Sequence, residues 1–219
     1  MIPVFVIVRD RFEQLKATVE QLEKAEGIDI ILLDNQSTYG PTVEWLEASH
    51  HKVIYLDANA GHHSPWIYGL VPPDGFYAVT DPDVRLIDEC PADWPVVMVD
   101  LLQRFTDVNK VGVSLRIDNL PDHYYLKQNV IDWEKQFWTS LRTHIKDTVP
   151  IFNAAVDTTL AMYKGGSGPS IAPALRTGWP YVAEHLAWYV NSNALTEDEI
   201  YYRTHTNTSV ASWRYSEAY

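Results

Sequence analysis

Two aspartates separated by one residue, Asp81 and Asp83, are the side chains in this sequence best placed for chemistry. They flank Pro82 and follow the apolar run Phe76-Tyr77-Ala78-Val79-Thr80. If that run is a strand, the proline stops further pairing, and both carboxylates lie at the carboxyl end of a sheet. Carboxylate oxygens are hard ligands that suit Mg²⁺ or Mn²⁺, an ion usually shared with nucleotide phosphates. The motif therefore predicts a metal-bound diphosphate, with an ordinary Asp-Pro turn as the alternative.

The composition is that of a folded globular protein. With 219 residues, of which 46% are hydrophobic and 21% charged, the chain is long enough to bury a substantial core. The formal net charge of −12 argues against a nucleic-acid partner, because nucleic acids bind a basic face. The single cysteine, Cys90, cannot form an internal disulfide, and the apolar run at residues 2–8 is too short to span a membrane. We expect a cytoplasmic protein without a membrane span.

The first 85 residues alternate between predicted strands and helices, which is typical of a parallel sheet built from βαβ units. Strands are expected at residues 3–8, 28–33, 52–56 and 76–80, and helices from residue 11 to before Gly27, at 40–46 and at 63–70. Polar or small residues follow each strand: Arg9 and Asp10, then Asp34 to Ser37, then Asn59 to His62, then Asp81 and Asp83. Because ligands bind beyond the carboxyl ends of such strands, these four groups should converge. No dinucleotide or P-loop glycine motif occurs, which disfavours those versions of the fold.

The second half shows a less regular pattern. Helices are expected at residues 94–105, 126–141 and 182–190, strands at 110–117 and 151–163, and an acidic turn at 197–199. Asp157 interrupts the apolar run at 151–163, and an unpartnered acid in such a run is costly. The glycine-rich residues 164–169 predict a mobile loop of the kind that often covers an active site.

The order of these motifs resembles the family 2-type glycosyltransferases of the GT-A fold. The resemblance covers residues 1 to about 85: Asp34-Asn35-Gln36-Ser37 is similar to the family's Asp-Asp-x-Ser, Asn59-Ala60-Gly61 to its Asn-x-Gly, and Asp81-Pro82-Asp83 to its Asp-x-Asp. Asn35 departs from the second acidic position, and His62 and His63 stand where a basic residue is common. The resemblance implies a single α/β domain with a mostly parallel sheet flanked by helices. Residues 1–115 would bind the nucleotide sugar, and residues 116–219 would form the acceptor and catalytic half.

The resemblance also implies roles for individual residues. A Mn²⁺ or Mg²⁺ ion would be held by Asp81, Asp83 and a later histidine, for which His205 and His185 compete. Glu184, expected at the start of the helix at 182–190, or Asp157 would activate the acceptor. Nucleotide contacts would come from Val8, Arg9, Asp34, Asn35, Ser37, Asn59, Gly61, His62, Thr80 and Asp81.

The activity implied by this resemblance is metal-dependent transfer of a hexose from a nucleotide diphosphate sugar, with a UDP-sugar favoured, to a carbohydrate or glycoconjugate acceptor. Two alternatives stay open. A nucleotidyltransferase on a related fold would use the same cation and release pyrophosphate, and a nucleotide- or sugar-binding protein would keep the site without turnover. The sequence points to no particular oligomeric state.

Overall fold

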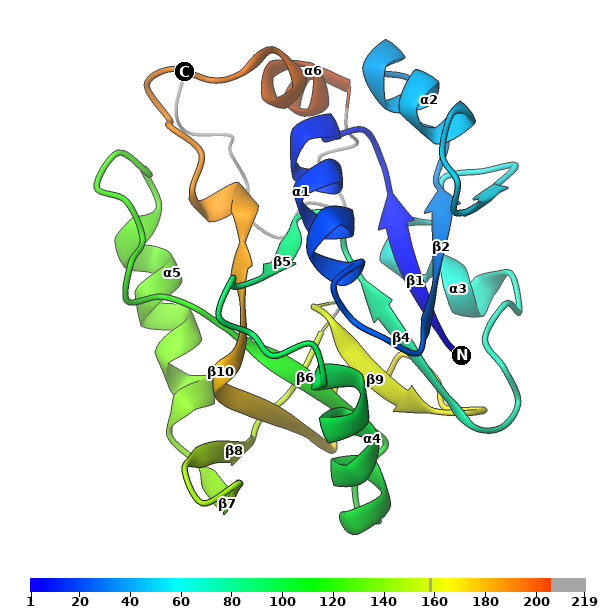
Figure 1. Cartoon of the computed structure of the whole chain (residues 1–219). Coiled ribbons are helices and arrows are strands. Elements are labelled where there is room, and N and C mark those ends of the chain that lie inside the picture. Colours follow the sequence, from blue (N-terminus) through cyan, green and yellow to red (C-terminus); the bar gives the residue numbers. More distant parts are fainter. Residues whose placement is uncertain (158, 206–219) are drawn as a thin grey trace.

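One mixed sheet of ten strands runs through the chain, and the computed structural model describes residues 1–157 and 159–205 (Figure 1). The strands are β1 (Ile2–Val8), β2 (Ile28–Asp34), β3 (Lys52–Tyr55), β4 (Phe76–Thr80), β5 (Val84–Leu86), β6 (Lys110–Leu115), β7 (Leu141–Ile145), β8 (Val149–Asn153), β9 (Ala161–Lys164) and β10 (Ala174–His185). Their order is β3-β2-β1-β4-β9-β6-β10-β8-β7, and β5 pairs with β10.

Most of these strands run in one direction. β1 is parallel to β2 and β4, β2 to β3, and β6 to β10. β9 is antiparallel to both β4 and β6, so β4 and β6 point the same way. Strands β3, β2, β1, β4, β6 and β10 therefore all end at one edge of the sheet, which we call the carboxyl edge. The expected single-domain α/β fold with a mostly parallel sheet is confirmed.

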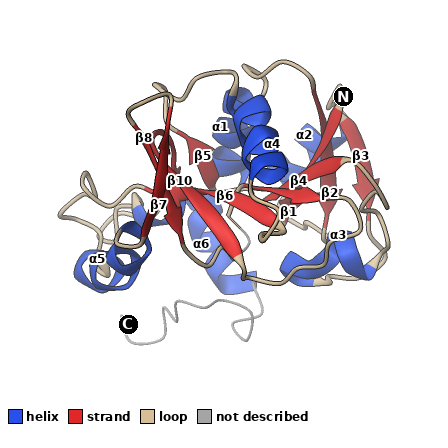
Figure 2. Ribbon diagram, turned by 90° about the horizontal axis from the view of Figure 1, so that it is seen from below, coloured by secondary structure: helices blue, strands red, loops and turns tan. Residues whose placement is uncertain are grey.

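Helices cover both faces of the sheet. The helices are α1 (Phe12–Leu22), α2 (Gly40–Glu47), α3 (Ser64–Ile67), α4 (Trp94–Arg104), α5 (Lys127–Glu134) and α6 (Glu197–His205). Figure 2 shows α1 and α4 on one side of the sheet and α3 on the other. No helix in the described residues combines the length and hydrophobicity needed to cross a membrane.

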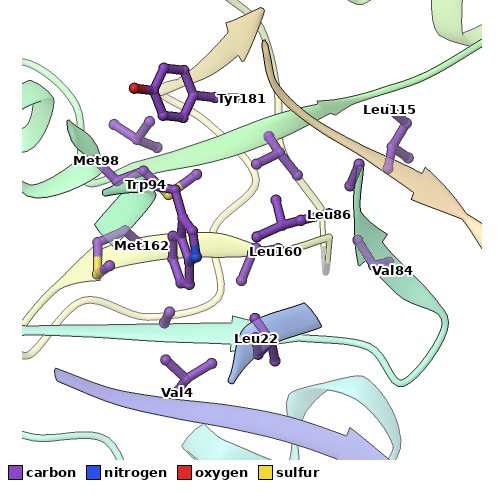
Figure 3. Packing of buried hydrophobic residues seen from close by; sticks show 14 of the residues in the cluster. Val4, Leu22, Val84, Leu86, Trp94, Met98, Leu115, Leu160, Met162 and Tyr181 are labelled. Carbon is purple, nitrogen blue, oxygen red and sulfur yellow. The ribbon is translucent and has the colours of Figure 1, made fainter. Parts of the chain in front are cut away.

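The larger core lies between the sheet and the helices α1 and α4. Leu15, Val19 and Leu22 recur at helical spacing and are buried, as the sequence pattern predicts. Figure 3 shows Leu22 near Val4 of β1, and Trp94 and Met98 of α4 near Met162 of β9. A smaller cluster on the opposite face includes Phe5, Tyr77 and Tyr163. Because both faces are covered, the inner strands are nearly continuous apolar runs.

Three predictions for the second half were wrong in detail. The helix expected at 126–141 ends earlier, as α5 followed by a 3-10 turn at Lys135–Trp138, and its last residue begins the hairpin β7–β8. The strand expected at 151–163 is two strands, β8 and β9, joined by an irregular segment. The helix expected at 182–190 begins instead as the last part of β10, because Ala183 pairs with both Leu86 and Leu115. Two neighbouring strands thus override the local helical pattern.

The glycine-rich segment does not lie over the carboxyl edge. Lys164 pairs with Phe76 at the start of β4, so the loop after it lies at the opposite edge. It is also hydrogen-bonded there: Gly165 N donates to Gly75 O at 2.8 Å, and the Tyr77 hydroxyl donates to Ser167 O at 2.6 Å. The prediction of a loop covering the site was therefore wrong.

Candidate functional site

Asp10 ties the end of β1 to the turn that follows β2. Its side chain is fully buried, and its Oδ1 accepts hydrogen bonds from Thr38 N at 2.7 Å and Tyr39 N at 2.8 Å. Its own N–H donates to Ser37 Oγ at 2.9 Å. Asp10 and Arg11 both have a φ of 52°, a left-handed conformation that costs energy for residues with a side chain. The chain accepts this local strain where β1 meets the carboxyl edge.

Asn35 joins the end of β2 to the loop after β3. The residue is buried, and its Oδ1 accepts from Ala60 N at 3.1 Å while its Nδ2 donates to Ser64 Oγ at 3.4 Å. The Arg9 guanidinium donates to the main-chain oxygens of Asn35, at 2.9 Å, and Gln36. The amide of Asn35 is thus committed to holding the loop that follows β3.

Two tight turns complete this side of the edge. Asp34 Oδ1 accepts from Ser37 N at 2.9 Å, which is the Asx turn expected from Asp34 to Ser37. Asn59 Oδ1 accepts from Gly61 N at 3.0 Å, and Gly61 has a φ of 65° that favours glycine. Val8, whose main-chain oxygen accepts from Asn35 N, has a fully buried side chain. The polar groups after β1, β2 and β3 therefore meet, as predicted.

The Asp-Pro-Asp turn lies at the end of β4, next to these groups. Asp81 is half-buried, and Asp83 is buried with its Oδ2 at 2.5 Å from Arg11 Nη1 and 3.8 Å from His185 Nε2. Burial alone would raise the pKa of Asp83, but the nearby charges of His185 and Arg11, together with hydrogen bonds, outweigh it and lower that pKa. Thr80, fully buried, donates from Oγ1 to Asp81 O at 3.2 Å.

Helix α6 lies near the start of α1 (Figure 1). Its residues Tyr202 and Glu199 contact Arg11 at this edge. The Arg11 guanidinium carbon lies 4.0 Å from the centre of the Tyr202 ring, and its Nη2 is 3.9 Å from Glu199 Oε1. Glu199 also accepts from Arg203 Nε at 2.8 Å. His205, at the end of α6, is exposed and stacks on Tyr201 with ring centres 3.9 Å apart. The acidic residues 197–199, expected as a turn, form the first turn of α6, where the helix dipole favours them.

The ligand atoms at this turn are not gathered around one point. Within residues 1–157 and 159–205, Asp81, Asp83 and His205 do not bring three ligand atoms within 4.8 Å of one another, and the same holds with His185 in place of His205. Asp83 is already neutralised by Arg11. The half-buried Asp81 carboxylate has the hard oxygen chemistry that Mg²⁺ or Mn²⁺ prefers, so it fits an ion completed by phosphate oxygens and water.

The ends of β6 and β10 bring a second acid to the same edge. Glu184 is a strand residue opposite Arg85, so its expected place at a helix start was wrong. Its Oε1 accepts from Asn119 Nδ2 at 3.1 Å, and its Oε2 lies 3.8 Å from Arg85 Nη1. Tyr189 donates its hydroxyl to Asn119 Oδ1 at 2.6 Å. Sequence reasoning missed Asn119 as a site residue, although residues 116–119 follow a strand with the same polar pattern as the first four groups.

Asp157 lies in the irregular segment between β8 and β9 and is exposed. This segment crosses close to β6, because a Cβ on Gly112 would lie 2.5 Å from Val156 Cγ1. Partial desolvation and the neighbouring His63 lower the pKa of His62, and the negative charge of Asp157 opposes that shift. Asp157 and His62, distant in sequence, are therefore close enough to interact. Arg176 anchors the segment by donating from Nε to Ala155 O at 2.8 Å.

Comparisons with known proteins give similarity in structure only. No protein-family model matches the chain, and no curated protein matches its sequence. A mannosyltransferase from Pyrobaculum calidifontis, in complex with GDP-Man and Mn²⁺, aligns with a TM-score of 0.46 and 15% identity over 74% of this chain, which spans 44% of that protein. An apo UDP-glucose pyrophosphorylase aligns with a TM-score of 0.44 and 9% identity over 94% of this chain and 100% of its own. At these TM-scores neither similarity identifies the function of this chain.

Proposed function

We propose that the carboxyl edge binds a nucleotide diphosphate sugar and that the chain is a metal-dependent glycosyltransferase. It would move a hexose, with a UDP-sugar favoured, to a carbohydrate or glycoconjugate acceptor. The observation that supports this most strongly is the position of the Asp-Pro-Asp turn. β4, which it follows, has the polar ends of β1, β2 and β3 on one side and those of β6 and β10 on the other. A donor on the first side and an acceptor on the second would meet at this turn.

The nucleoside would lie against the ends of β1, β2 and β3. Arg9, Asp34 and Ser37 would offer polar atoms at the first two ends, and Asn59, Gly61 and His62 at the third. Val8, Asn35 and Thr80 are buried, so in this proposal they shape the strand ends and loops that the nucleotide meets.

A divalent ion, Mn²⁺ or Mg²⁺, would be held by Asp81 together with phosphate oxygens, and its chemistry would be to neutralise the leaving diphosphate. Asp83 would join it only by giving up part of its pairing with Arg11, which lies 2.5 Å away. His205 would join only by leaving its stack on Tyr201. Until then Arg11 is the cation nearest Asp83, and it could itself face a phosphate.

The acceptor would be activated by Glu184 or Asp157 if the anomeric centre inverts. Asn119 and Arg85 contact the Glu184 carboxylate. Glu184 pairs with Arg85, which comes two residues after Asp83 in the chain. That arrangement orients the carboxylate, as a general base requires. Asp157 is the alternative base, and its negative charge acts on His62, which is assigned above to the nucleotide.

The test is calorimetric titration with UDP and a panel of UDP-sugars, first with Mn²⁺ and then with chelator, followed by assay of released UDP. The wild-type protein should bind only with the metal, and Asp81→Asn should weaken binding at least about tenfold. Asp29→Asn, an exposed aspartate at the start of β2, is the matched control and should bind as the wild type does. Binding that ignores the chelator, or no binding to any nucleotide, would overturn the proposal.

A second candidate is a nucleotide-sugar-binding protein without turnover. The pairing of Asp83 with Arg11 favours it, because that carboxylate is not open to an ion in this arrangement. Metal-dependent binding with neither transfer nor hydrolysis would identify this case. Release of pyrophosphate in place of UDP would instead identify a nucleotidyltransferase.

A further inference from the structure

A cluster of two histidines and a glutamate lies far from the proposed donor site. Glu23 directly follows α1, and His50 and His51 directly precede β3. β1, β2 and β3 are parallel, so β2 and β3 both begin at the edge of the sheet opposite the carboxyl edge. α1, which leads into β2, therefore ends at that opposite edge. None of the residues assigned above to the nucleotide, the acceptor or the cation belongs to this cluster.

The three side chains already point one ligand atom each to a common place. Glu23 Oε1 lies 3.2 Å from His50 Nε2 and 3.0 Å from His51 Nε2, and all three atoms lie within 4.8 Å of one another. The two imidazole rings have centres 4.0 Å apart. In a tetrahedral zinc site with bonds of about 2.0 to 2.2 Å, ligand atoms are separated by roughly 3.3 to 3.6 Å. The two Glu23 to histidine separations, 3.2 Å and 3.0 Å, lie just below those values.

We infer that Glu23, His50 and His51 form a binding site for a late first-row divalent ion, with Zn²⁺ as the reference ion. Two imidazole nitrogens and one carboxylate oxygen suit Zn²⁺, Cu²⁺, Ni²⁺ or Co²⁺, whereas Mg²⁺ takes an octahedron of oxygens. Within the described part of the chain, no other histidines, cysteines or carboxylates bring three ligand atoms this close.

Burial and charge around the cluster suit an ion that enters from solvent. The His51 side chain is largely buried, with 13% exposed, and the Glu23 side chain is 38% exposed. The His50 side chain is 78% exposed, so this side of the cluster is open to water. The neighbouring cation Lys24 is directed elsewhere, with its Nζ 2.5 Å from Gln21 Oε1 and 3.6 Å from Asp88 Oδ1. Three protein ligands leave one position of a tetrahedron for water.

Such an ion would link the end of α1 to the segment that leads into the edge strand β3. Without it, the contacts are those of ordinary histidine–glutamate hydrogen bonds on a surface, which contribute little to stability. Because an ion that binds only the folded state stabilises it, Zn²⁺ should raise the thermal midpoint of the protein in proportion to the logarithm of its concentration.

The experiment uses the full chain without an affinity tag, stripped with EDTA and dialysed free of it. Calorimetric titration with Zn²⁺ should give one site, and Mg²⁺ at the same concentrations should give none there. Glu23→Gln and His50→Ala should each weaken Zn²⁺ binding at least about tenfold. His50 is exposed, so its removal leaves the core intact. Co²⁺ should give the visible absorption of a tetrahedral site in the wild type and lose it in Glu23→Gln.

The chain offers a matched control in its other adjacent histidine pair. His62 and His63 have ring centres 4.1 Å apart, but within the described residues they belong to no such three-ligand group. His63→Ala should therefore bind Zn²⁺ as the wild type does. Loss of the site in His63→Ala, or equal binding by the wild type and Glu23→Gln, would overturn the inference.

This outcome is independent of the proposed function. Zn²⁺ binding at the cluster should be unchanged by UDP, and Glu23→Gln should keep whatever nucleotide binding the wild type shows. Failure of either proposal therefore leaves the other standing. A zinc titration that loses its heat in Asp81→Asn but not in Glu23→Gln would place the ion at the carboxyl edge and overturn the inference.

Discussion

Two buried arginine–carboxylate pairs, one at the carboxyl edge and one beneath the acceptor half, have the same chemistry and opposite electrostatics. Arg11 and Asp83 join β1 to the turn after β4 at 2.5 Å, and Arg176 and Glu134 join β10 to α5 at 3.0 Å. All four side chains are at least nine-tenths buried. Yet the pKa of Asp83 is lowered and that of Glu134 is raised.

The difference comes from the third charge near each pair. Burial pushes both carboxyl pKa values upward. At Asp83 the interactions with His185 and Arg11, together with hydrogen bonds, overcome that effect. At Glu134 the single cation Arg176 does not, and the negative charge of Asp157 adds to the upward shift. The third group thus lowers the carboxyl pKa in the first pair and raises it in the second.

This contrast indicates what each pair does for the protein. The Arg176 pair is enclosed, with Arg176 Nε also donating to Ala155 O, so it fixes the segment that leads to Asp157. The Arg11 pair lies where the polar strand ends meet, so an incoming diphosphate would encounter the Arg11 guanidinium beside the Asp83 carboxylate. A structural pair and a pair within a binding site should thus respond differently when one member is removed.

The largest expected effect is at the enclosed pair. Arg176→Met leaves Glu134 buried without its cation and removes the hydrogen bond to Ala155 O, so it should lower the free energy of unfolding by about 3 to 5 kcal/mol. Because burial already raises the pKa of Glu134, the carboxyl group should take up a proton and recover part of this loss at lower pH. Urea unfolding at pH 5.5 and at pH 8 measures both effects.

The control for this prediction is the double variant Glu134→Gln/Arg176→Met. It removes the charge that Arg176→Met leaves unpaired, so it should be more stable than the single variant. If the double variant is as unstable as the single one at both pH values, the loss comes from packing around the guanidinium rather than from the buried charge.

The next effect is at the carboxyl edge. Asp83→Asn removes one partner of a buried pair, but Arg11 keeps Gln14 Oε1 at 3.0 Å and Glu199 at 3.9 Å. The free energy of unfolding should therefore fall by about 2 to 3 kcal/mol, less than at Arg176. If Asp83 serves binding, the same variant should also change UDP affinity, which Arg176→Met should do only by unfolding the protein. Urea unfolding and calorimetry on the same samples separate the two.

The pH dependence of Asp83 has a definite sign. Its pKa in the folded protein lies below the ordinary value of 3.8, so its ionised form contributes stability that is complete above about pH 5. The contribution should fall as the pH drops below that value and vanish below the lowered pKa. Asp83→Asn should lack this acid-dependent part, and Asp29→Asn should retain it. If the free energy of unfolding fell equally at acid pH in Asp83→Asn and in the wild type, the lowered pKa of Asp83 would be contradicted.

The comparison also shows how much of the fold was readable in the sequence. The first half was predicted well because β1 and residues 30–33 of β2 are continuous apolar runs and Leu15, Val19 and Leu22 keep a strict helical period. The end of β10 was not, because residues 182–190 have a mixed pattern and the first of them, up to His185, are held in a strand by β5 and β6, which come from far earlier in the chain. Such pairing is decided by tertiary contacts that local propensity does not contain.

The site was predictable to the same extent. The polar residues after the strands predicted that the groups at Arg9, Asp34 and Asp81 lie close together, because parallel strands end at one edge of the sheet. The partner of Asp83 was not predicted. Arg11 was expected only as the beginning of a helix, whereas it adopts a left-handed conformation and its Nη1 lies 2.5 Å from Asp83 Oδ2. His185 was a minor candidate as a metal ligand, but it, rather than His205, lies 3.8 Å from Asp83.

The smallest effect concerns Lys110, a buried cation next to the enclosed pair. Burial lowers its pKa to about 8, Arg176 adds to this shift and Asp157 opposes it. Its Nζ has the Tyr163 hydroxyl at 3.3 Å. Since the unfolded chain holds this proton to about pH 10.5, wild-type stability should rise between pH 8 and 9.5. Lys110→Met should remove the cost of the buried charge and stabilise the protein by about 1 kcal/mol at pH 7, with less gain at pH 9.5.

Lys52 provides the matched control, because it is also the first residue of a strand but is exposed. Lys52→Met should leave both the stability and its pH dependence near the wild-type values. A gain in stability in Lys110→Met would mean that the charge of Lys110 destabilises the region around Arg176 and Glu134. The Arg11 pair differs, because Arg11 faces the carboxylates of Asp83 and Glu199. A loss at pH 7 would mean that the contact with Tyr163 outweighs burial, and the two regions would then differ less than their opposite pKa shifts indicate.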